Sequence, residues 1–222
     1  MGLLLMLMTI GGLLVAGILF AIAWLNESAW LKRFVLGSVA IWLAFYVVML
    51  IGASLLSTGK LIEVGDADGK AFCGFYLDCH MHTAVTGVRK ATSIGERESK
   101  GEFYIVTVKV FSDAQAATLG LLTVDAHIVD DANNIYARDV QAEENLGEQP
   151  PFERQISPAD NFEKRIVFDL PADVQNPRLD VREGYGIDHA IEFVLIGDED
   201  SIFHKRNYFN LADTTLPRAS ND

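Results

Sequence analysis

Charge is absent from two long stretches near the N-terminus. Residues 3–25 and 34–57 contain no Asp, Glu, Lys or Arg. Each stretch exceeds the roughly 20 apolar residues that cross a bilayer core of about 30 Å, so we predict transmembrane helices at 3–25 and 34–57. The same absence argues against transport, because proton relays and ion paths need ionisable groups inside the bilayer.

The first apolar stretch also lacks the features of a secretory signal peptide, which is the alternative interpretation. Such a peptide needs a basic start, an apolar run of about 7 to 15 residues and a small-residue cleavage site. Here Met1 and Gly2 lead directly into the apolar run, which ends at Trp24 and Asn26 as an interface would. We therefore expect this stretch to be retained as a helix.

Basic residues are few, and their position predicts an orientation. Lys32 and Arg33 lie in the short connection between the two predicted helices, which we expect on the cytoplasmic side. Both termini and everything after Lys60 then lie outside.

The first 60 residues contribute a net charge of +2 to the chain's net charge of −12, which leaves a net charge of −14 on residues 61–222. An acidic outer domain is unsuited to nucleic acid and to anionic lipid.

Small residues recur at a spacing of four within both predicted helices. This spacing lets helix backbones approach closely, although such pairs also arise by chance in apolar helices. We treat them as candidate helix-packing residues. They are Gly12, Ala16, Gly17, Ala21, Ala40 and Ala44.

Beyond the helices the pattern is that of β-strands. Residues 61–71 have the composition of a polar linker, and 72–214 are expected to form the outer domain, followed by a polar tail at 215–222. In residues 103–111 Tyr104, Val106, Val108 and Val110 alternate with polar positions, as in a half-buried strand. Further strands are predicted at 121–130 and 135–138, joined as a hairpin, and at 162–170, 179–182, 191–196 and 207–211. About seven to nine strands without a convincing amphipathic helix indicate an all-β sandwich. Residues 139–151 form an acidic loop or a single helical turn.

Four segments give this region a family resemblance. The order of 101–110, 128–136, 156–158 and 166–171 resembles the bacterial telokin-like family of secreted immunoglobulin-type domains of unknown function, over roughly residues 80–182. The resemblance implies an immunoglobulin-like fold and no catalytic residues. Ala159 and Asn134 stand where that family has glycine, so the turn types are expected to differ.

Cysteine occurs only twice, at Cys73 and Cys79, and residues 73–82 also hold His80 and His82. Outside the cytoplasm the two cysteines are expected to form a disulfide. The alternative is a copper or zinc site, for which His80 and His82 would project to one face of an extended strand. A c-type haem is excluded because five residues, and not two, separate the cysteines.

No group of residues in the sequence resembles a catalytic site. His127, His189 and His204 are isolated, and Ser157 lacks the G-x-S-x-G context. Asp198, Glu199 and Asp200 are expected in a solvent-facing turn, where a calcium site is an alternative.

The sequence therefore predicts a non-enzymatic protein of a bacterial inner membrane, without a cofactor. We expect an accessory subunit that binds integral membrane proteins of a larger complex, such as a respiratory or photosynthetic assembly. The alternative is an extracytoplasmic copper- or zinc-binding protein that uses Cys73, Cys79, His80 and His82.

Overall fold

The computed structural model describes residues 2–74 and 78–212, and these divide into two compact units. The first unit comprises residues up to Gly59 together with Gly186–Arg206. The second comprises Lys60–Tyr185 and the chain from Asn207 onward. The chain therefore passes between the units three times. The predicted tail at 215–222 lies outside the described residues.

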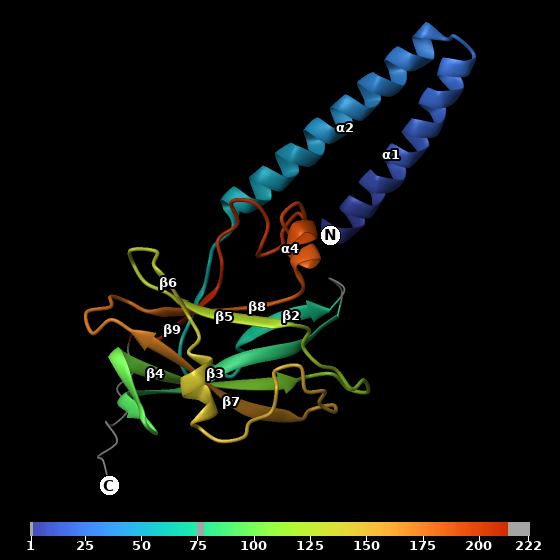
Figure 1. Cartoon of the computed structure of the whole chain (residues 1–222). Helices are drawn as coiled ribbons and strands as arrows, with labels where there is room; N and C mark the ends of the chain where they lie inside the picture. Colours follow the sequence, from blue (N-terminus) through green and yellow to red (C-terminus); the bar gives the residue numbers. More distant parts are fainter. Residues whose placement is uncertain (1, 75–77, 213–222) are drawn as a thin grey trace. The chain divides into compact units, whose positions relative to one another are not determined.

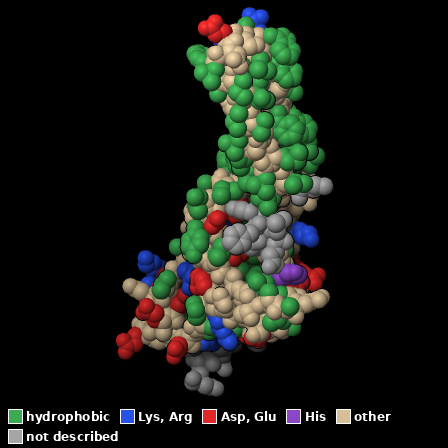
Figure 2. Space-filling model, turned by 90° about the vertical axis from the view of Figure 1, so that its right-hand side faces the viewer, with side chains coloured by type: hydrophobic (Ala, Val, Ile, Leu, Met, Phe, Trp, Pro, Cys, Tyr) green, Lys and Arg blue, Asp and Glu red, His purple; other side chains and the backbone are tan. Residues whose placement is uncertain are grey.

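Two long helices dominate the first unit, α1 (Gly2–Leu25) and α2 (Ala29–Leu56) (Figure 1). Ser28 begins α2 by accepting a hydrogen bond from the Leu31 backbone N–H, as an N-cap residue does. Helix α2 therefore starts five residues before the predicted residue 34, and Lys32 and Arg33 lie in its first turns. Trp42 Nε1 donates to Thr9 Oγ1 over 3.0 Å, and Ala23 and Val35 are buried where the helices pack. Apolar side chains cover the hairpin, and charged ones gather at its tip (Figure 2).

The first unit also contains a segment that we predicted wrongly. Residues 191–196 were expected to form a strand, but Gly186–Glu192 form helix α4 and turns follow it. The reason is visible in the sequence IEFVLI, which is apolar throughout and does not alternate, so periodicity cannot separate a strand from a helix or a packed turn. A His189–Glu192 ion pair of 2.9 Å across one helical turn supports the helical form.

The second unit is a sandwich of two sheets, as predicted. One sheet has the order β1-β9-β8-β5-β6 and the other β2-β3-β4-β7 (Figure 1). All neighbouring strands run antiparallel except β1 and β9, which are parallel. The strands are β1 (Leu61–Ile62), β2 (Lys70–Gly74), β3 (Asp78–Ile94), β4 (Arg97–Ser112), β5 (Val124–Val129), β6 (Ile135–Ala137), β7 (Asn161–Leu170), β8 (Arg178–Glu183) and β9 (Tyr208–Asn210). Residues 61–71 are thus not only a linker, because β1 and the start of β2 pair into the sheets.

Strand β4 shows how the sequence builds the core. Its predicted face of Tyr104, Val106, Val108 and Val110 is buried between the sheets, in one cluster with residues of both. The opposite face was expected to be polar, yet Phe103 and Ile105 are buried there as well. They pack with Ala142 of helix α3 (Val140–Glu144), which lies in the predicted acidic loop. This helix therefore adds a local third layer.

The α3 segment also covers the outer edge of β7. Glu143 accepts a hydrogen bond from the Val167 backbone N–H, and the Val167 carbonyl accepts one from the Asp139 N–H. Gln149 accepts a hydrogen bond from the Arg165 backbone N–H and donates one to its carbonyl. An open strand edge would be a site for pairing with other chains, and these side chains occupy it.

Two turns adopt backbone conformations that usually favour glycine. In the β5–β6 hairpin the left-handed residue is Asn133, at φ 60°, and not Asn134, which was predicted to replace a glycine. Ala159 also has φ 60°, so the turn retains the geometry of glycine at that position with an alanine. Asparagine tolerates this region well, whereas alanine is strained in it.

The β5–β6 hairpin is stabilised by a carboxylate, which makes it sensitive to acid. Asp130 is buried and accepts hydrogen bonds from the Asn134 backbone N–H, the Asn134 side-chain amide and the Tyr136 hydroxyl. The Asn134 side-chain hydrogen bond, foremost among these, holds the pKa of Asp130 below its usual range. A depressed carboxyl pKa contributes stability above the unfolded value of about 3.9, and the contribution is lost as pH falls through the folded pKa.

We therefore expect Asp130→Asn to lower the Tm at pH 7, and the difference from wild type to shrink as the pH falls below about 4. Thermal unfolding followed by circular dichroism measures both. Asp68→Asn is the control, because Asp68 is exposed on a turn and its loss should change the Tm little at any pH. A Tm difference for Asp130→Asn that is independent of pH would contradict this account.

Candidate functional site

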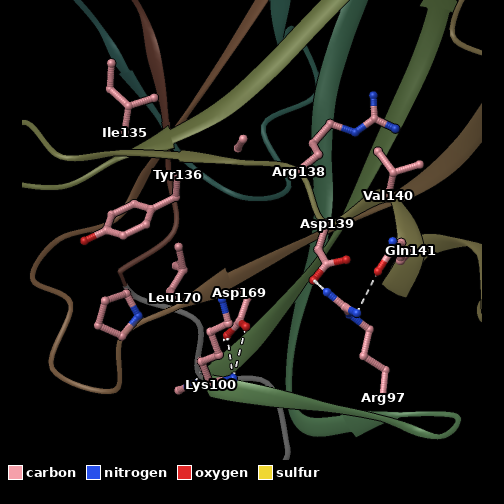
Figure 3. A pocket seen from close by; sticks show the side chains of 13 residues that line it. Arg97, Lys100, Ile135, Tyr136, Arg138, Asp139, Val140, Gln141, Asp169 and Leu170 are labelled. Atoms are coloured by element: carbon pink, nitrogen blue, oxygen red, sulfur yellow. Dashed lines mark hydrogen bonds and ion pairs between the residues drawn. The ribbon is translucent and has the colours of Figure 1, made fainter.

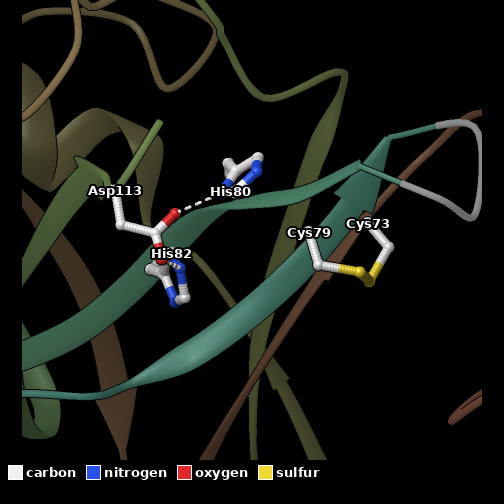
Figure 4. The surroundings of a disulfide bond; sticks show 5 residues. All are labelled: Cys73, Cys79, His80, His82 and Asp113. Atoms are coloured by element: carbon white, nitrogen blue, oxygen red, sulfur yellow. Dashed lines mark hydrogen bonds and ion pairs between the residues drawn. A yellow bond between two sulfur atoms is a disulfide. The ribbon is translucent and has the colours of Figure 1, made fainter. Parts of the chain in front are cut away.

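The Cys73–Cys79 disulfide joins the last residues of β2 to the first residues of β3, at the turn end of this hairpin, which confirms the first interpretation of the cysteine-rich stretch (Figure 4). The pairing of β2 with β3 shifts register between Phe72 and Gly74, and this irregularity places the two cysteines opposite each other. No free cysteine occurs in the described chain. The two sulfur atoms therefore do not supply thiolate ligands for a metal.

His80 and His82 lie on one face of β3, as alternation predicted, and both approach Asp113, which follows β4 (Figure 4). His80 Nδ1 lies 2.6 Å from one Asp113 oxygen, and His82 Nε2 lies 3.4 Å from the other. The His82 ring stacks on Phe111 with ring centroids 5.0 Å apart. The hydrogen bond from His80 is the main reason that the pKa of Asp113 is lowered. Two imidazoles and one carboxylate thus converge on an exposed corner.

A cavity of about 720 Å³ opens beside β6, at the end of the sandwich where β4 begins and β7 ends (Figure 3). Ligand pockets commonly have about 300–1,000 Å³, so its size suits a small molecule. Basic side chains line it in an otherwise acidic domain, namely Arg97, Lys100 and Arg138. The described lining contains no serine, cysteine or histidine.

The two arginines of the cavity already form hydrogen bonds and ion pairs with other residues of the protein. Arg97 donates to Asp139 over 2.7 Å and to Gln141 over 2.9 Å. Arg138 forms a two-bond ion pair with Glu143, a buried residue of α3. These contacts hold the α3 segment against the sheets. We interpret the cavity as a by-product of that attachment, and a ligand would have to break an ion pair to gain an arginine.

A buried polar cluster links the two sheets and was missed at the sequence level. Lys70 of β2 reaches across the core, donating to the Val181 carbonyl over 2.7 Å, and its Nζ lies 3.8 Å from Asp180. Arg182 also donates to Asp180, at 3.0 Å, and His127 Nε2 lies 3.5 Å away. His127 is therefore not isolated. Only the β5–β8 register, which places His127 opposite Asp180, identifies the partners.

A second polar cluster lies in the first unit. His189, Glu192 and Asp200 bring their ligand atoms within 4.8 Å of one another, so His189 is not isolated either. Arg206 Nη2 lies 2.7 Å from the second oxygen of Asp200. An arginine already balances this carboxylate, so the cluster is explained as an ion-pair network within Gly186–Arg206. A helical interpretation of 186–192 would have identified the His189–Glu192 pair.

The small residues of the helices face outward in this unit. A β-carbon added to Gly12 or Gly17 would meet no atom within 4 Å, and Ala21, Ala40 and Ala44 are exposed. Ala16 alone is partly buried, near the α1–α2 contact. The packing within the hairpin therefore uses other residues, such as Thr9, Ala23 and Val35. Within the described chain the predicted packing surfaces, apart from Ala16, are exposed.

The fold thus defines a β-sandwich domain preceded by two long apolar helices. The chain belongs to the family described as a domain of unknown function (DUF4352), whose model matches residues 78–191, just over half of the chain. No curated protein matches the chain.

Two solved structures are similar in outline to the sandwich. One is the secreted protein MPT63 from Mycobacterium tuberculosis, at 13% identity and a TM-score of 0.38, covering 59% of this chain and 94% of that protein. The other is an uncharacterized β-sandwich protein from Clostridium difficile, at 12% identity and a TM-score of 0.34, covering 70% and 97%.

The disulfide gives a prediction that decides whether thiolate ligands are available. In intact-mass analysis the purified chain should take up no alkylating reagent before reduction and two equivalents after it. Replacing both cysteines with serine should lower the free energy of unfolding by about 2 kcal/mol, the chain-entropy value for a loop of about seven residues. Two reactive thiols in the native protein would overturn the disulfide and return the cysteines to the metal hypothesis.

Proposed function

We propose that this chain is a non-enzymatic, membrane-anchored protein whose sandwich lies outside the cytoplasm and which serves as an accessory subunit of a larger membrane complex. The observation that carries the proposal is the helical hairpin, whose two helices are 24 and 28 residues long and apolar on nearly all sides. In water such a surface would be unstable, whereas lipid accommodates it. The disulfide in the sandwich is consistent with an oxidising compartment.

The partner part of the proposal rests on surfaces that the hairpin does not use itself. Helices in lipid associate through close packing, because lipid gives apolar side chains no reason to cluster. The outward-facing small residues of α1 and α2 provide such packing surfaces. A respiratory or photosynthetic complex is the kind of host that we expect. An immunoglobulin-like, telokin-like identity of the sandwich belongs to the same proposal and implies binding rather than catalysis.

Orientation is the first test. Arg33 and Lys32 near the tip of the hairpin predict a cytoplasmic tip. In intact cells a membrane-impermeant thiol reagent should label Asn145→Cys, on the exposed α3 segment, and should not label Ala29→Cys at the tip. Permeabilised cells should show both sites labelled, which controls for reactivity. Labelling of the tip alone in intact cells would reverse the orientation.

Partner binding is the second test. Replacing Gly12 and Gly17 with leucine should weaken association with membrane partners by roughly tenfold or more, because the larger side chains prevent close backbone approach. The hairpin itself should tolerate the change, since a side chain at either position meets nothing in the unit. Native gels and co-purification after mild-detergent extraction measure association.

The matched control is Gly11→Leu. Gly11 is equally open but has valine, and not a small residue, four positions later. This variant should associate like wild type. A wild-type protein that migrates as a free monomer, under conditions that preserve other membrane complexes, would refute the subunit proposal.

A second candidate function is metal binding at the corner formed by His80, His82 and Asp113. The convergence of both imidazoles on one carboxylate favours it, since zinc and copper accept these ligand types. Without the cysteines the site would need a side-chain rotation and an additional ligand. Metal content of the purified protein, compared with that of His82→Ala, distinguishes this candidate from the first.

A further inference from the structure

The segment Gly186–Arg206 packs along α2 over its last turns. The Tyr46 hydroxyl donates to the Val194 carbonyl over 2.8 Å, Ser54 and Ser201 hydroxyls lie 3.2 Å apart, and the Lys205 N–H donates to Ser57. These helix residues span about 16 Å along the axis at a rise of about 1.5 Å per residue. The segment is thus held at several points along one end of the hairpin.

The N-terminal end of α1 meets the same segment. A β-carbon on Gly2 would lie 2.0 Å from the carbonyl oxygen of Ile196, so only glycine permits this approach. Within the segment Leu195 is buried, and the Ile202 N–H donates to the Phe193 carbonyl over 3.0 Å. That bond brings Phe203 into the neighbourhood of Phe193 and Val194. We refer to the exposed side chains of Phe193, Val194 and Phe203 as the apolar patch of this segment.

The side chains of this patch are left open. Phe203 is 65% exposed, Phe193 50% and Val194 41%. Phe203 moreover has φ 62°, a conformation that a bulky residue rarely adopts. The backbone therefore presents an aromatic ring outward at a cost, which points to a contact that compensates for it.

The level of the patch along α2 identifies what covers it. Counting roughly 20 residues from Phe34, directly after Lys32 and Arg33, places the far edge of the hydrocarbon core near Ser54, whose hydroxyl lies against Ser201 of the segment. We propose that Phe193, Val194 and Phe203 enter the boundary between headgroups and acyl chains of the outer leaflet, so that Gly186–Arg206 is an interfacial lipid-binding element. This inference rests on the proposed membrane anchor.

The charges of the segment agree with a shallow position. His189 pairs with Glu192 and Arg206 with Asp200, so acidic groups are balanced where water is scarce. Burial raises the pKa of Glu192 and of Asp198. Non-helical backbone cannot lie exposed in the hydrocarbon core itself, which limits the segment to the interface.

The test uses the full chain in vesicles of phosphatidylcholine and phosphatidylglycerol. An environment-sensitive fluorophore is attached at Phe203→Cys or, as a second position, at Phe193→Cys, and lipids with a spin label near the headgroup or deep in the acyl chain quench it. The native cysteines are paired and do not react. A fluorophore at Val47→Cys, which is exposed on α2, shows whether the helix lies in the bilayer. A fluorophore at Ile135→Cys, which is exposed on β6, gives the signal of a position in water.

We expect headgroup-level quenching at positions 193 and 203 several-fold above that at Ile135→Cys, and deep quenching at Val47→Cys. Quenching at Val47→Cys without quenching at 193 and 203 would overturn the lipid contact and leave the anchor intact. Absence of quenching at Val47→Cys would overturn the anchor itself and the inference with it. Protection of position 203 from the lipid labels and also from an added water-soluble quencher would assign the patch to a contact with a second copy of this chain, since the vesicles contain no other protein, and would overturn the inference.

Discussion

The mutual burial of two apolar sheet faces is the constraint on which the sandwich depends. It removes Tyr104, Val106 and Phe168 from water together with their counterparts on the other sheet. A polar group trapped between the sheets must then find a partner, because an unpaired buried charge costs several kcal/mol. Lys70 meets this requirement by donating to the Val181 carbonyl beside Asp180. The lysine and its partners come from different sheets, so their contact also favours one alignment of the two layers.

The same constraint explains which strands could be predicted. Strand β5 has one buried and one more open face over most of its length, and its buried Val124, Ala126 and Ile128 keep the two-residue period. Strand β3 does not, because its pairing with β4 shifts register between Val85 and Gly87 and again between Ala91 and Ser93. Each shift changes the face on which successive side chains lie, which hides the strand from periodicity. In β4 the alternation of buried and exposed residues is lost at Phe103 and Ile105 for another reason. Helix α3 packs on the face of β4 that was expected to be polar and buries these two side chains.

Contacts of the candidate site could be predicted only where they are local. Alternation placed His80 and His82 on one face, and the count of two cysteines indicated the disulfide. Asp113 is 33 residues from His80, and His127 meets Asp180 from another strand. Such partners follow from strand register, which a single sequence does not contain. Ala159 shows a different failure, since we expected its turn to differ from the glycine-containing turn of the family pattern, yet Ala159 adopts the left-handed conformation that its own chemistry disfavours.

Two parts of the first unit lie outside the residues that the family model matches. The match covers 78–191, so it includes neither the hairpin nor most of the segment after α4. These two parts are bonded to each other, through Tyr46 with Val194 and Ser57 with Lys205. Their continuations into the sandwich are also paired, since β1 and β9 are neighbours with Leu61 opposite Tyr208. An isolated apolar loop carrying Phe203 at φ 62° would be unstable. The segment therefore depends on α2 for its structure.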